Sequence, residues 1–372
     1  MQLSVAAALA VVLVSAFSAD VQAEPTSSAA LSLEESFSRA ADRILPSIVA
    51  INTYARGKAR RRPSETGWRV AGQKRNPHHR LLLSRTGFVV SDEGFILTSH
   101  HGVLDPDTRK PAEIIEVELA DRSFAHARFI GAEPNLDLAV IKLDLDRPVS
   151  AAPIARDATL RTGSWAIAVG DPPGPERTFA AQPIASPPQR ECYQEELTAT
   201  LIQASMHVPP ESWGGPWVNL RGDVIGIGLP RRQDLLAGSA PSGAAFALPI
   251  DLAMNLYEPL IVRESAKSPW LGISVLEAPR AWRTTQREAR LTDRGVLIDD
   301  IFDPSPAASA GLRVGDVLTR LGNEPVTSVA SFQRQLYLNG IDAPVTLEFW
   351  RNGERSTAKA IIRQRPDRAT VR

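Results

Sequence analysis

The chain has 372 residues, which is enough for two or three domains with hydrophobic cores of their own. Lys and Arg together number 42, as do Asp and Glu, so the formal net charge is zero and argues against a nucleic-acid-binding protein or an acidic tail. The 24 glycines and 29 prolines, with many short apolar runs between them, favour a mainly β chain with many turns.

Residues 1–23 predict a signal peptide. The apolar run from Val5 to Phe17 is too short to span a bilayer comfortably as a helix. Val21 and Ala23 are small or branched residues suited to the positions before a signal-peptidase cut, so we expect cleavage after Ala23. A retained N-terminal anchor is the alternative, because the segment before the apolar run lacks Lys and Arg. The single cysteine, Cys192, excludes an internal disulfide, which fits a bacterial periplasm better than an extracellular eukaryotic setting.

Residues 24–53 are expected to hold an N-terminal helix and the first strand. Ser32 is an N-cap candidate, and Glu35 three residues later would complete a capping box. The helix should end before Pro46, and residues 47–53 follow as a strand. The buried face of the helix is expected to carry a stripe of apolar residues, namely Leu33, Phe37, Ala40 and Ile44.

Residues 54–85 are strongly basic, with ten Lys or Arg and a single acid, Glu65. We expect a solvated loop insertion here. The alternative is an electrostatic contact with anionic lipid, polysaccharide or an acidic partner through Arg60, Arg61 and Arg62.

Short strands bounded by turn residues follow, at a spacing typical of barrels or sandwiches. A linker is expected over 251–268, with a partly helical linker as the alternative. A second β-rich unit is expected after it, with a helix around 328–338. The expected strands of the first part are 88–91, 95–98, 114–119, 124–130, 138–143, 165–169 and 224–229.

Several blocks resemble the HtrA (Do-like, DegP-type) serine proteases. FVVSDEGFILTSHHGV (88–103) resembles the family segment that delivers the catalytic histidine, and by register this is His101. NLDLAVIKL (135–143) resembles the segment whose first Asp orients that histidine, here Asp137. The resemblance continues through 166–174, 218–228 and 245–249. It implies a trypsin-like double six-stranded β-barrel over 32–250.

The family pattern breaks at the nucleophile. The family reads roughly NPGNSGGP, whereas this chain reads PPESWGGP (209–216), so Trp213 replaces the serine. Glu211 stands where a glycine N–H helps to form the oxyanion hole, and Trp213 occupies the second oxyanion-hole position. Ser212 is the alternative nucleophile, provided that the loop brings it to His101.

His101 and Asp137 are expected to persist as a hydrogen-bonded pair in the cleft. A metal site built from His100, His101 and His207 is an alternative that no ligand motif supports. We expect neither a metal nor another cofactor.

The C-terminal part resembles a PDZ domain (α+β) over 269–364, followed by a tail at 365–372. PWLGIS (269–274) resembles the carboxylate-binding loop, and GVLIDDIFDPSPAASAGLRVGDVLTRLGNEPV (295–326) is similar to the central strands and short helix. A PDZ domain binds a peptide as an added strand and holds its terminal carboxylate with loop N–H groups. A helix over 331–338 would form the other groove wall, unless the groove is covered or packs on the first domain. By motif position the loop residues are Trp270, Leu271, Gly272 and Ile273.

These patterns predict a periplasmic pseudoprotease that binds peptides or unfolded proteins as a chaperone or adaptor. The first alternative is a serine endopeptidase of envelope protein quality control that uses Ser212 or keeps weak activity. The second is an envelope scaffold that binds anionic surfaces through the basic loop. Expected partners are polypeptides or protein C-termini, not nucleic acid, and the family resemblance implies a homotrimer.

Overall fold

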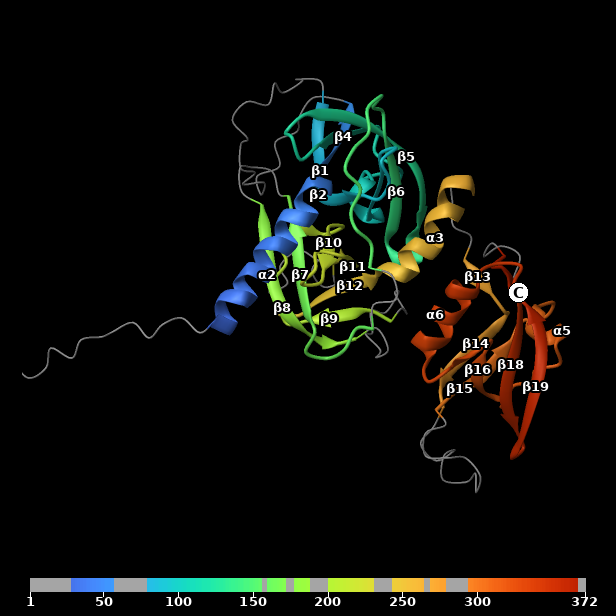
Figure 1. Cartoon of the computed structure of the whole chain (residues 1–372). Coiled ribbons are helices and arrows are strands. Elements are labelled where there is room, and N and C mark those ends of the chain that lie inside the picture. The colour runs from blue at the N-terminus through green and yellow to red at the C-terminus, as the bar shows by residue number, and fades with distance from the viewer. Residues whose placement is uncertain are drawn as a thin grey trace, which may run out of the picture.

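The computed structural model describes residues 28–56, 79–155, 159–171, 177–187, 200–230, 243–263, 268–278 and 294–366. Two closed six-stranded β-barrels lie next to each other, and a smaller β-rich unit follows at the C-terminus (Figure 1). The mainly β double barrel expected from the sequence is confirmed.

The first barrel is closed in the strand order β1-β2-β3-β6-β5-β4. Alternate residues along these strands, such as Val49 and Ile51, point into one buried cluster with Ile96, Val117 and Ile141. The strands are β1 (Ile48–Arg56), β2 (His79–Val89), β3 (Phe95–Ser99), β4 (Ile114–Glu118), β5 (Phe124–Glu133) and β6 (Leu138–Leu143).

The second barrel is closed in the order β10-β11-β12-β9-β8-β7. Its core contains the fully buried Trp217 and small residues such as Ala166 and Ala247. Its strands are β7 (Trp165–Gly170), β8 (Thr178–Ser186), β9 (Ile202–Ala204), β10 (Pro216–Val218), β11 (Val224–Leu229) and β12 (Ala245–Pro249).

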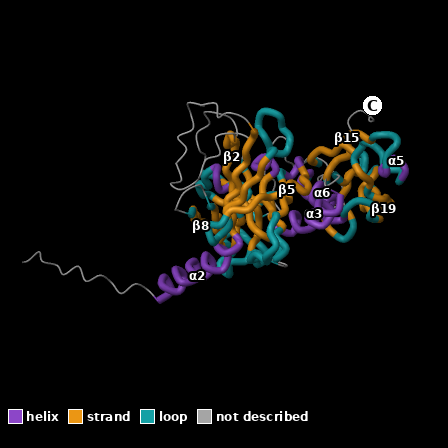
Figure 2. The backbone as a smooth tube through the Cα atoms, turned by 90° about the horizontal axis from the view of Figure 1, so that it is seen from above, coloured by secondary structure: helices purple, strands orange, loops and turns teal. Residues whose placement is uncertain are grey.

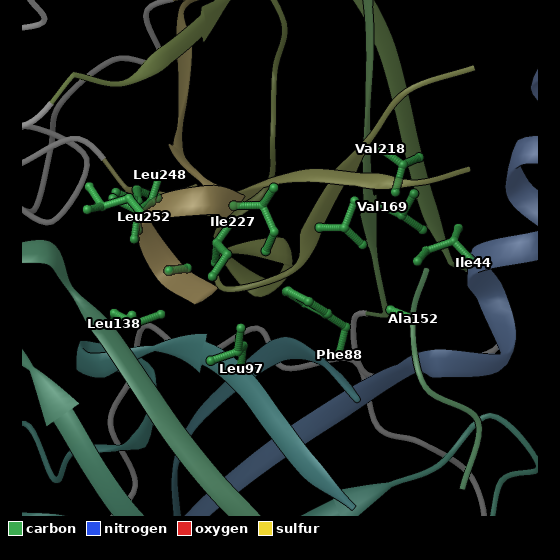
Figure 3. Packing of buried hydrophobic residues seen from close by; sticks show 14 of the residues in the cluster. Ile44, Phe88, Leu97, Leu138, Ala152, Val169, Val218, Ile227, Leu248 and Leu252 are labelled. Atoms are coloured by element: carbon green, nitrogen blue, oxygen red, sulfur yellow. The ribbon is translucent and has the colours of Figure 1, made fainter. Parts of the chain in front are cut away.

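A continuous apolar cluster joins the two barrels (Figure 3). Phe88, Leu97 and Leu138 of the first barrel face Val169 and Ile227 of the second. The cluster therefore sets the position of the strands of one barrel relative to those of the other.

The N-terminal helix α2 spans Ser28–Ile44, and η1 (Leu45–Ser47) carries the chain from it into β1. The expected N-cap, Ser32, is wrong: it lies inside the helix, because the helix begins one turn earlier. Ala40 and Ile44 bury the inner face of α2 between the barrels as the apolar stripe predicts.

The ends of the expected basic loop are not loop. β1 runs to Arg56 and β2 starts at His79, so parts of 54–85 belong to the first barrel. Arg60, Arg61 and Arg62 lie outside the described residues, as do the predicted signal peptide at 1–23 and Cys192. Among the helices that the structure describes, none combines the length and apolar character needed to cross a membrane.

The expected linker at 251–268 is largely a helix, α3 (Ile250–Arg263). Its apolar face, including Leu252, Leu256 and Leu260, is buried in the cluster between the barrels. Pro259 lies within this helix, and the buried apolar face holds the helix in place despite the proline.

The C-terminal unit contains a six-stranded sheet in the order β14-β15-β16-β18-β19, with β17 paired to β16, and a separate pair of β13 with β20. Helix α6 (Val329–Asn339) begins at the N-cap Ser328 and packs beside α3 (Figure 2). The remaining elements are β13 (Pro269–Trp270), β14 (Ile273–Glu277), β15 (Val296–Ile301), α5 (Pro306–Ser309), β16 (Val317–Leu321), β17 (Glu324–Pro325), β18 (Pro344–Arg351), β19 (Glu354–Ile361) and β20 (Arg363–Gln364).

Candidate functional site

The structure brings His101 and Asp137 together. His101 lies on η2 (His100–Val103), the turn that follows β3, and Asp137 follows η3 (Pro134–Leu136) with a left-handed φ of 49°. Asp137 Oδ2 lies 2.7 Å from His101 Nδ1, and Asp137 Oδ1 accepts a hydrogen bond from the His101 backbone N–H at 2.8 Å. Two bonds to one carboxylate fix both the ring and the backbone of His101.

Trp213 lies beside this pair at the C-terminal end of η4 (Pro210–Ser212). Its side chain is buried, with only 6% of its surface exposed. The Trp213 and His101 rings meet edge to face, with centroids 5.9 Å apart and planes at 66°. The indole therefore fills the side of His101 on which a nucleophile would stand.

Backbone N–H groups of the same loop are engaged within the protein. The Trp213 N–H donates to Pro210 O at 3.2 Å, and the Gly214 N–H donates to Gly228 O at 2.8 Å. Glu211 O accepts a hydrogen bond from Thr86 Oγ1 at 2.9 Å, which holds the loop against β2. The N–H at position 213 therefore has an internal acceptor and does not face the cleft as a free donor.

Ser212 is not brought to His101. Its side chain is 4% exposed, and its Oγ lies 2.6 Å from Thr178 Oγ1 of β8. On its other side it contacts Gly170: a Cβ added there would lie 2.0 Å from Ser212 Oγ. The hydroxyl therefore points into the second barrel.

Arg85 of β2 is a site residue that the sequence analysis missed. Its Nε donates to His101 Nε2 at 3.3 Å, and its guanidinium carbon lies 5.4 Å from the centroid of the Trp213 ring. Arg85 Nη1 also donates to Ser84 O at 2.8 Å. The only sequence signal was a basic residue three positions before Phe88, and it was counted with the basic loop.

Burial lowers the pKa of the Arg85 guanidinium, while the negative charges of Glu211 and Asp137 act in the opposite direction. Burial also lowers the pKa of His100, partly offset by Asp137. An arginine stays charged even after such a shift because its ordinary pKa is so high. The site therefore holds a fixed positive charge next to a histidine.

The alternative of a metal site at His100, His101 and His207 finds no support in the described ranges. They contain no group of three or more His, Cys, Asp or Glu side chains arranged to hold a metal ion.

The C-terminal unit places Trp270, Leu271, Gly272 and Ile273 at the turn between β13 and β14. Leu271 is buried, and Gly272 has a φ of +81°, which favours glycine. Two carbonyls of this turn accept hydrogen bonds, Leu271 O from Ala307 N at 2.9 Å and Gly272 O from Phe302 N at 3.0 Å. These two hydrogen bonds hold the backbone of the turn in place.

The strand that follows this turn, β14, lies at the edge of its sheet, and α6 packs next to it. At the far end of β14, Glu277 Oε1 accepts a hydrogen bond from the Val329 N–H in the first turn of α6 at 2.7 Å. An edge strand beside a helix is the arrangement that accepts a peptide as an added strand.

A polar cluster joins the C-terminal unit to the segment that carries Asp137. The buried Glu133 accepts hydrogen bonds from the Asn135 backbone N–H and side-chain amide, at 3.1 and 2.8 Å, and from Ser268 Oγ. Burial raises the pKa of Glu133, although its hydrogen bonds act the other way. Burial, with the nearby charge of Glu133, likewise raises the pKa of Tyr337 on α6.

Comparison with known proteins agrees with this architecture. Residues 85–227 match the trypsin-like peptidase domain, and residues 269–362 match the PDZ domain. A probable periplasmic serine endoprotease DegP-like from Pseudomonas fluorescens is 32% identical over 76% of this chain and 56% of its own length. A putative serine protease HhoB from Synechocystis is 30% identical over 73% of this chain and 64% of its own.

Solved structures share the fold. The HtrA-type protease AlgW with tripeptide superposes with a TM-score of 0.67 at 22% identity and covers 90% of this chain and 99% of its own. The serine endoprotease from Yersinia pestis gives a TM-score of 0.57 at 23% identity over 89% of this chain and 98% of its own. This chain spans a little over half the length of the DegP-like relatives.

Proposed function

We propose that this chain, a homologue of the HtrA and DegP proteases built from a trypsin-like peptidase domain and one PDZ domain, binds polypeptides without cleaving them. The proposal goes beyond the homology, because the relatives are named as proteases. It rests on the contacts of the residues around His101.

The observation that carries the proposal is the partner of His101 Nε2. In a trypsin-like mechanism this nitrogen takes the proton of the attacking hydroxyl. Here it accepts a hydrogen bond from Arg85 Nε, while Nδ1 faces Asp137. Because a guanidinium only donates, the lone pair of Nε2 is already occupied by a cationic donor, which also disfavours adding a proton there.

The residue at the nucleophile position supports the same conclusion. An indole N–H is a donor only and cannot attack a carbonyl carbon. The Trp213 ring also fills the space beside the imidazole where a scissile carbonyl would have to stand. Losing the nucleophile alone typically lowers kcat by several orders of magnitude.

The oxyanion site is a third, independent support. Stabilising a tetrahedral intermediate needs backbone N–H groups that point at the developing oxyanion. The Trp213 N–H instead donates to Pro210 O. Loss of a single oxyanion donor costs on the order of a hundred- to a thousand-fold in kcat, so this term adds to the missing nucleophile.

Ser212 is the alternative nucleophile, and its contacts favour a structural role. A hydroxyl that shares a 2.6 Å hydrogen bond with Thr178 and is almost fully buried would have to change rotamer and move with its loop to reach His101. Such a movement would break the Thr178 bond and the contact with Gly170.

The PDZ domain supplies a second place for polypeptide binding. β14 has a free edge within the described part of the sheet, α6 lies beside it, and the Leu271–Gly272 turn is fixed from behind. The AlgW structures contain a tripeptide or a decapeptide, which supports peptides as ligands of this fold. The ligands in this proposal are polypeptide segments or protein C-termini.

The test combines binding and cleavage on the full chain. Purified protein is incubated with casein beside a His101→Ala control, and separately with a serine-directed fluorophosphonate. We expect casein to bind and stay intact in both samples and no residue to be labelled. Labelling of Ser212, or casein degradation that His101→Ala abolishes, would establish the endopeptidase alternative instead.

Location and assembly belong to the same proposal. The relatives are named periplasmic, which supports export to the periplasm through a signal peptide cut after Ala23; N-terminal sequencing of the secreted protein would reveal a retained segment. A homotrimer is inferred from the family resemblance and is tested by light scattering. The scaffold alternative is tested by reversing the charges of Arg60, Arg61 and Arg62, which should abolish surface association only if that loop binds anionic envelopes.

A further inference from the structure

The Arg85 guanidinium has no carboxylate in contact with it among the described residues. It makes hydrogen bonds to two neutral acceptors, His101 Nε2 and Ser84 O, and its Nη2 makes none. Glu211 and Asp137 act on it only through longer-range attraction, and Asp137 is already bound to His101. Burial removes part of the hydration of this cation, and carboxylates that act only from a distance replace that hydration incompletely.

The guanidinium is also held in one orientation. It stacks against the Trp213 ring, its Nε is bound to His101, and its Nη1 is bound to the β2 backbone. Its aliphatic stem is confined by the turn after β3, since a Cβ added at Gly102 would lie 2.9 Å from Arg85 Cγ. A planar donor fork fixed in this way is preorganised for a carboxylate, which pairs with arginine through two oxygens.

We propose that the peptidase domain binds a carboxylate side chain of an acidic polypeptide segment beside His101, with Arg85 as the anchoring residue. The carboxylate would accept hydrogen bonds from the free Nη2 and Nη1 hydrogens. It would stand close to His101, on the face that a protease would offer to its scissile bond. This inference rests on the proposed non-catalytic function and adds to it the class of segment that this site selects.

The charges that face the guanidinium limit the strength of this site without removing it. Glu211 lies on η4, Asp137 follows η3, and His100 and His101 belong to η2. Asp137 is engaged with His101, and Glu211 forms no ion pair with Arg85, so the fork has no competing carboxylate in contact. A bound carboxylate would be repelled by Glu211, and replacing Glu211 with Gln should therefore tighten binding.

The experiment measures binding of two short peptides that carry a neutral fluorescent label at the N-terminus. They differ only in a central Glu or Gln. Both are amidated at the C-terminus, so the PDZ loop has no terminal carboxylate to hold. Fluorescence anisotropy is recorded with the full chain at low salt, because exposed charge pairs are screened at high salt.

We expect the wild-type chain to bind the Glu peptide at least tenfold more tightly than the Gln peptide. This follows because a charge-assisted hydrogen bond contributes more than a neutral one, and a factor of ten is about 1.4 kcal/mol. Arg85→Gln should abolish the preference, and Arg85→Lys should keep part of it without the planar fork. Inorganic phosphate at millimolar concentration is added as a competitor; displacement by phosphate alone, with no Glu preference, would identify a simple anion site and overturn the proposal.

Arg80→Gln is the matched control, because it removes one positive charge from the same strand at a residue already paired with Asp107. It should leave the Glu preference unchanged. Equal binding of both peptides to the wild type, or a preference that persists in Arg85→Gln, would overturn the carboxylate site.

If circular dichroism shows that Arg85→Gln does not fold, two other variants replace it in the test. Arg85→Lys should weaken binding of the Glu peptide, and Glu211→Gln should tighten it. Cleavage of either peptide would refute the proposed function but not the carboxylate site. Intact casein bound without a Glu preference would refute only the carboxylate site.

Discussion

Asn135 Nδ2 donates a hydrogen bond to Ser268 Oγ at 2.9 Å. Asn135 lies two residues before Asp137, and Ser268 immediately precedes β13 of the PDZ domain. The two residues therefore tie the segment that carries Asp137 to the segment that enters the Leu271–Gly272 turn. A second link joins α3 to α6, where Asn255 Nδ2 donates a hydrogen bond to Tyr337 O at 2.7 Å.

Glu133 accepts hydrogen bonds in this interdomain cluster, and its replacement should change the pH dependence of stability. Burial raises the folded-state pKa of Glu133 above its unfolded value of about 4.3. The folded state then binds more protons than the unfolded state between the two pKa values, so stability falls as pH rises through the folded pKa. Residue 133 no longer titrates in Glu133→Gln. The unfolding free energy of this variant should therefore rise relative to that of the wild type as pH increases above the unfolded-state pKa of about 4.3.

Urea unfolding at several pH values checks this. Glu133→Ala serves as the companion variant, because it removes the acceptor of the Asn135 backbone N–H and of the Ser268 hydroxyl. This loss should cost about 1–3 kcal/mol. Parallel pH profiles for wild type and Glu133→Gln would contradict the assigned cause.

Trp213→Ser alone should restore little proteolysis. The new hydroxyl would meet a His101 whose Nε2 is occupied by Arg85 and a loop whose N–H at 213 is bound to Pro210 O. We expect casein turnover at least a hundredfold below that of an active homologue, because the oxyanion donor is still missing. Release of acid-soluble peptides is the measurement, and robust turnover that His101→Ala abolishes would show that this account of the loop is wrong.

Gly170→Ala should destabilise the second barrel and its junction with η4. The added Cβ would lie 2.0 Å from Ser212 Oγ and 2.4 Å from Ser212 Cβ, so the loop itself must move. We expect a loss of about 1–3 kcal/mol, since overpacking a filled site costs that much. Gly243→Ala is the control, because no atom lies within 4 Å of its Cβ position. Thermal unfolding of both variants measures the difference in stability. Equal melting temperatures would argue against a rigid loop.

Gly272→Ala should weaken binding of peptides with a free C-terminal carboxylate. Its Cβ would lie 2.1 Å from Ser305 Cβ, and its φ of +81° disfavours any side chain. We expect at least a tenfold loss of affinity, about 1.4 kcal/mol. Gly340→Ala carries a similar φ of +80° with no atom within 4 Å, so it shares the backbone strain but lies outside the turn. The affinities are measured by calorimetric titration. An equal loss of affinity in both variants would show that the turn does not hold the peptide carboxylate.

The local register of the chain was sufficient to predict much of this protein. Short apolar runs bounded by turn residues predicted strands such as Leu138–Leu143 and Val224–Leu229 with their observed bounds, because this signal lies within each segment of the sequence. Short blocks before and after them predicted the places of His101, Asp137 and Trp213. The helix expected around 328–338 corresponds to α6 (Val329–Asn339).

Contacts between distant segments were decided by the tertiary structure. Arg85 comes from β2, His101 from the turn after β3 and Trp213 from the loop between β9 and β10. Only closure and packing of the two barrels place them together. The same closure decides the rotamer of Ser212, which Thr178 and Gly170 set. It also decides helix α3, whose apolar face is buried in the cluster between the barrels. A sequence pattern specifies which way a side chain faces on its own strand, whereas its partners depend on how the strands pack in three dimensions.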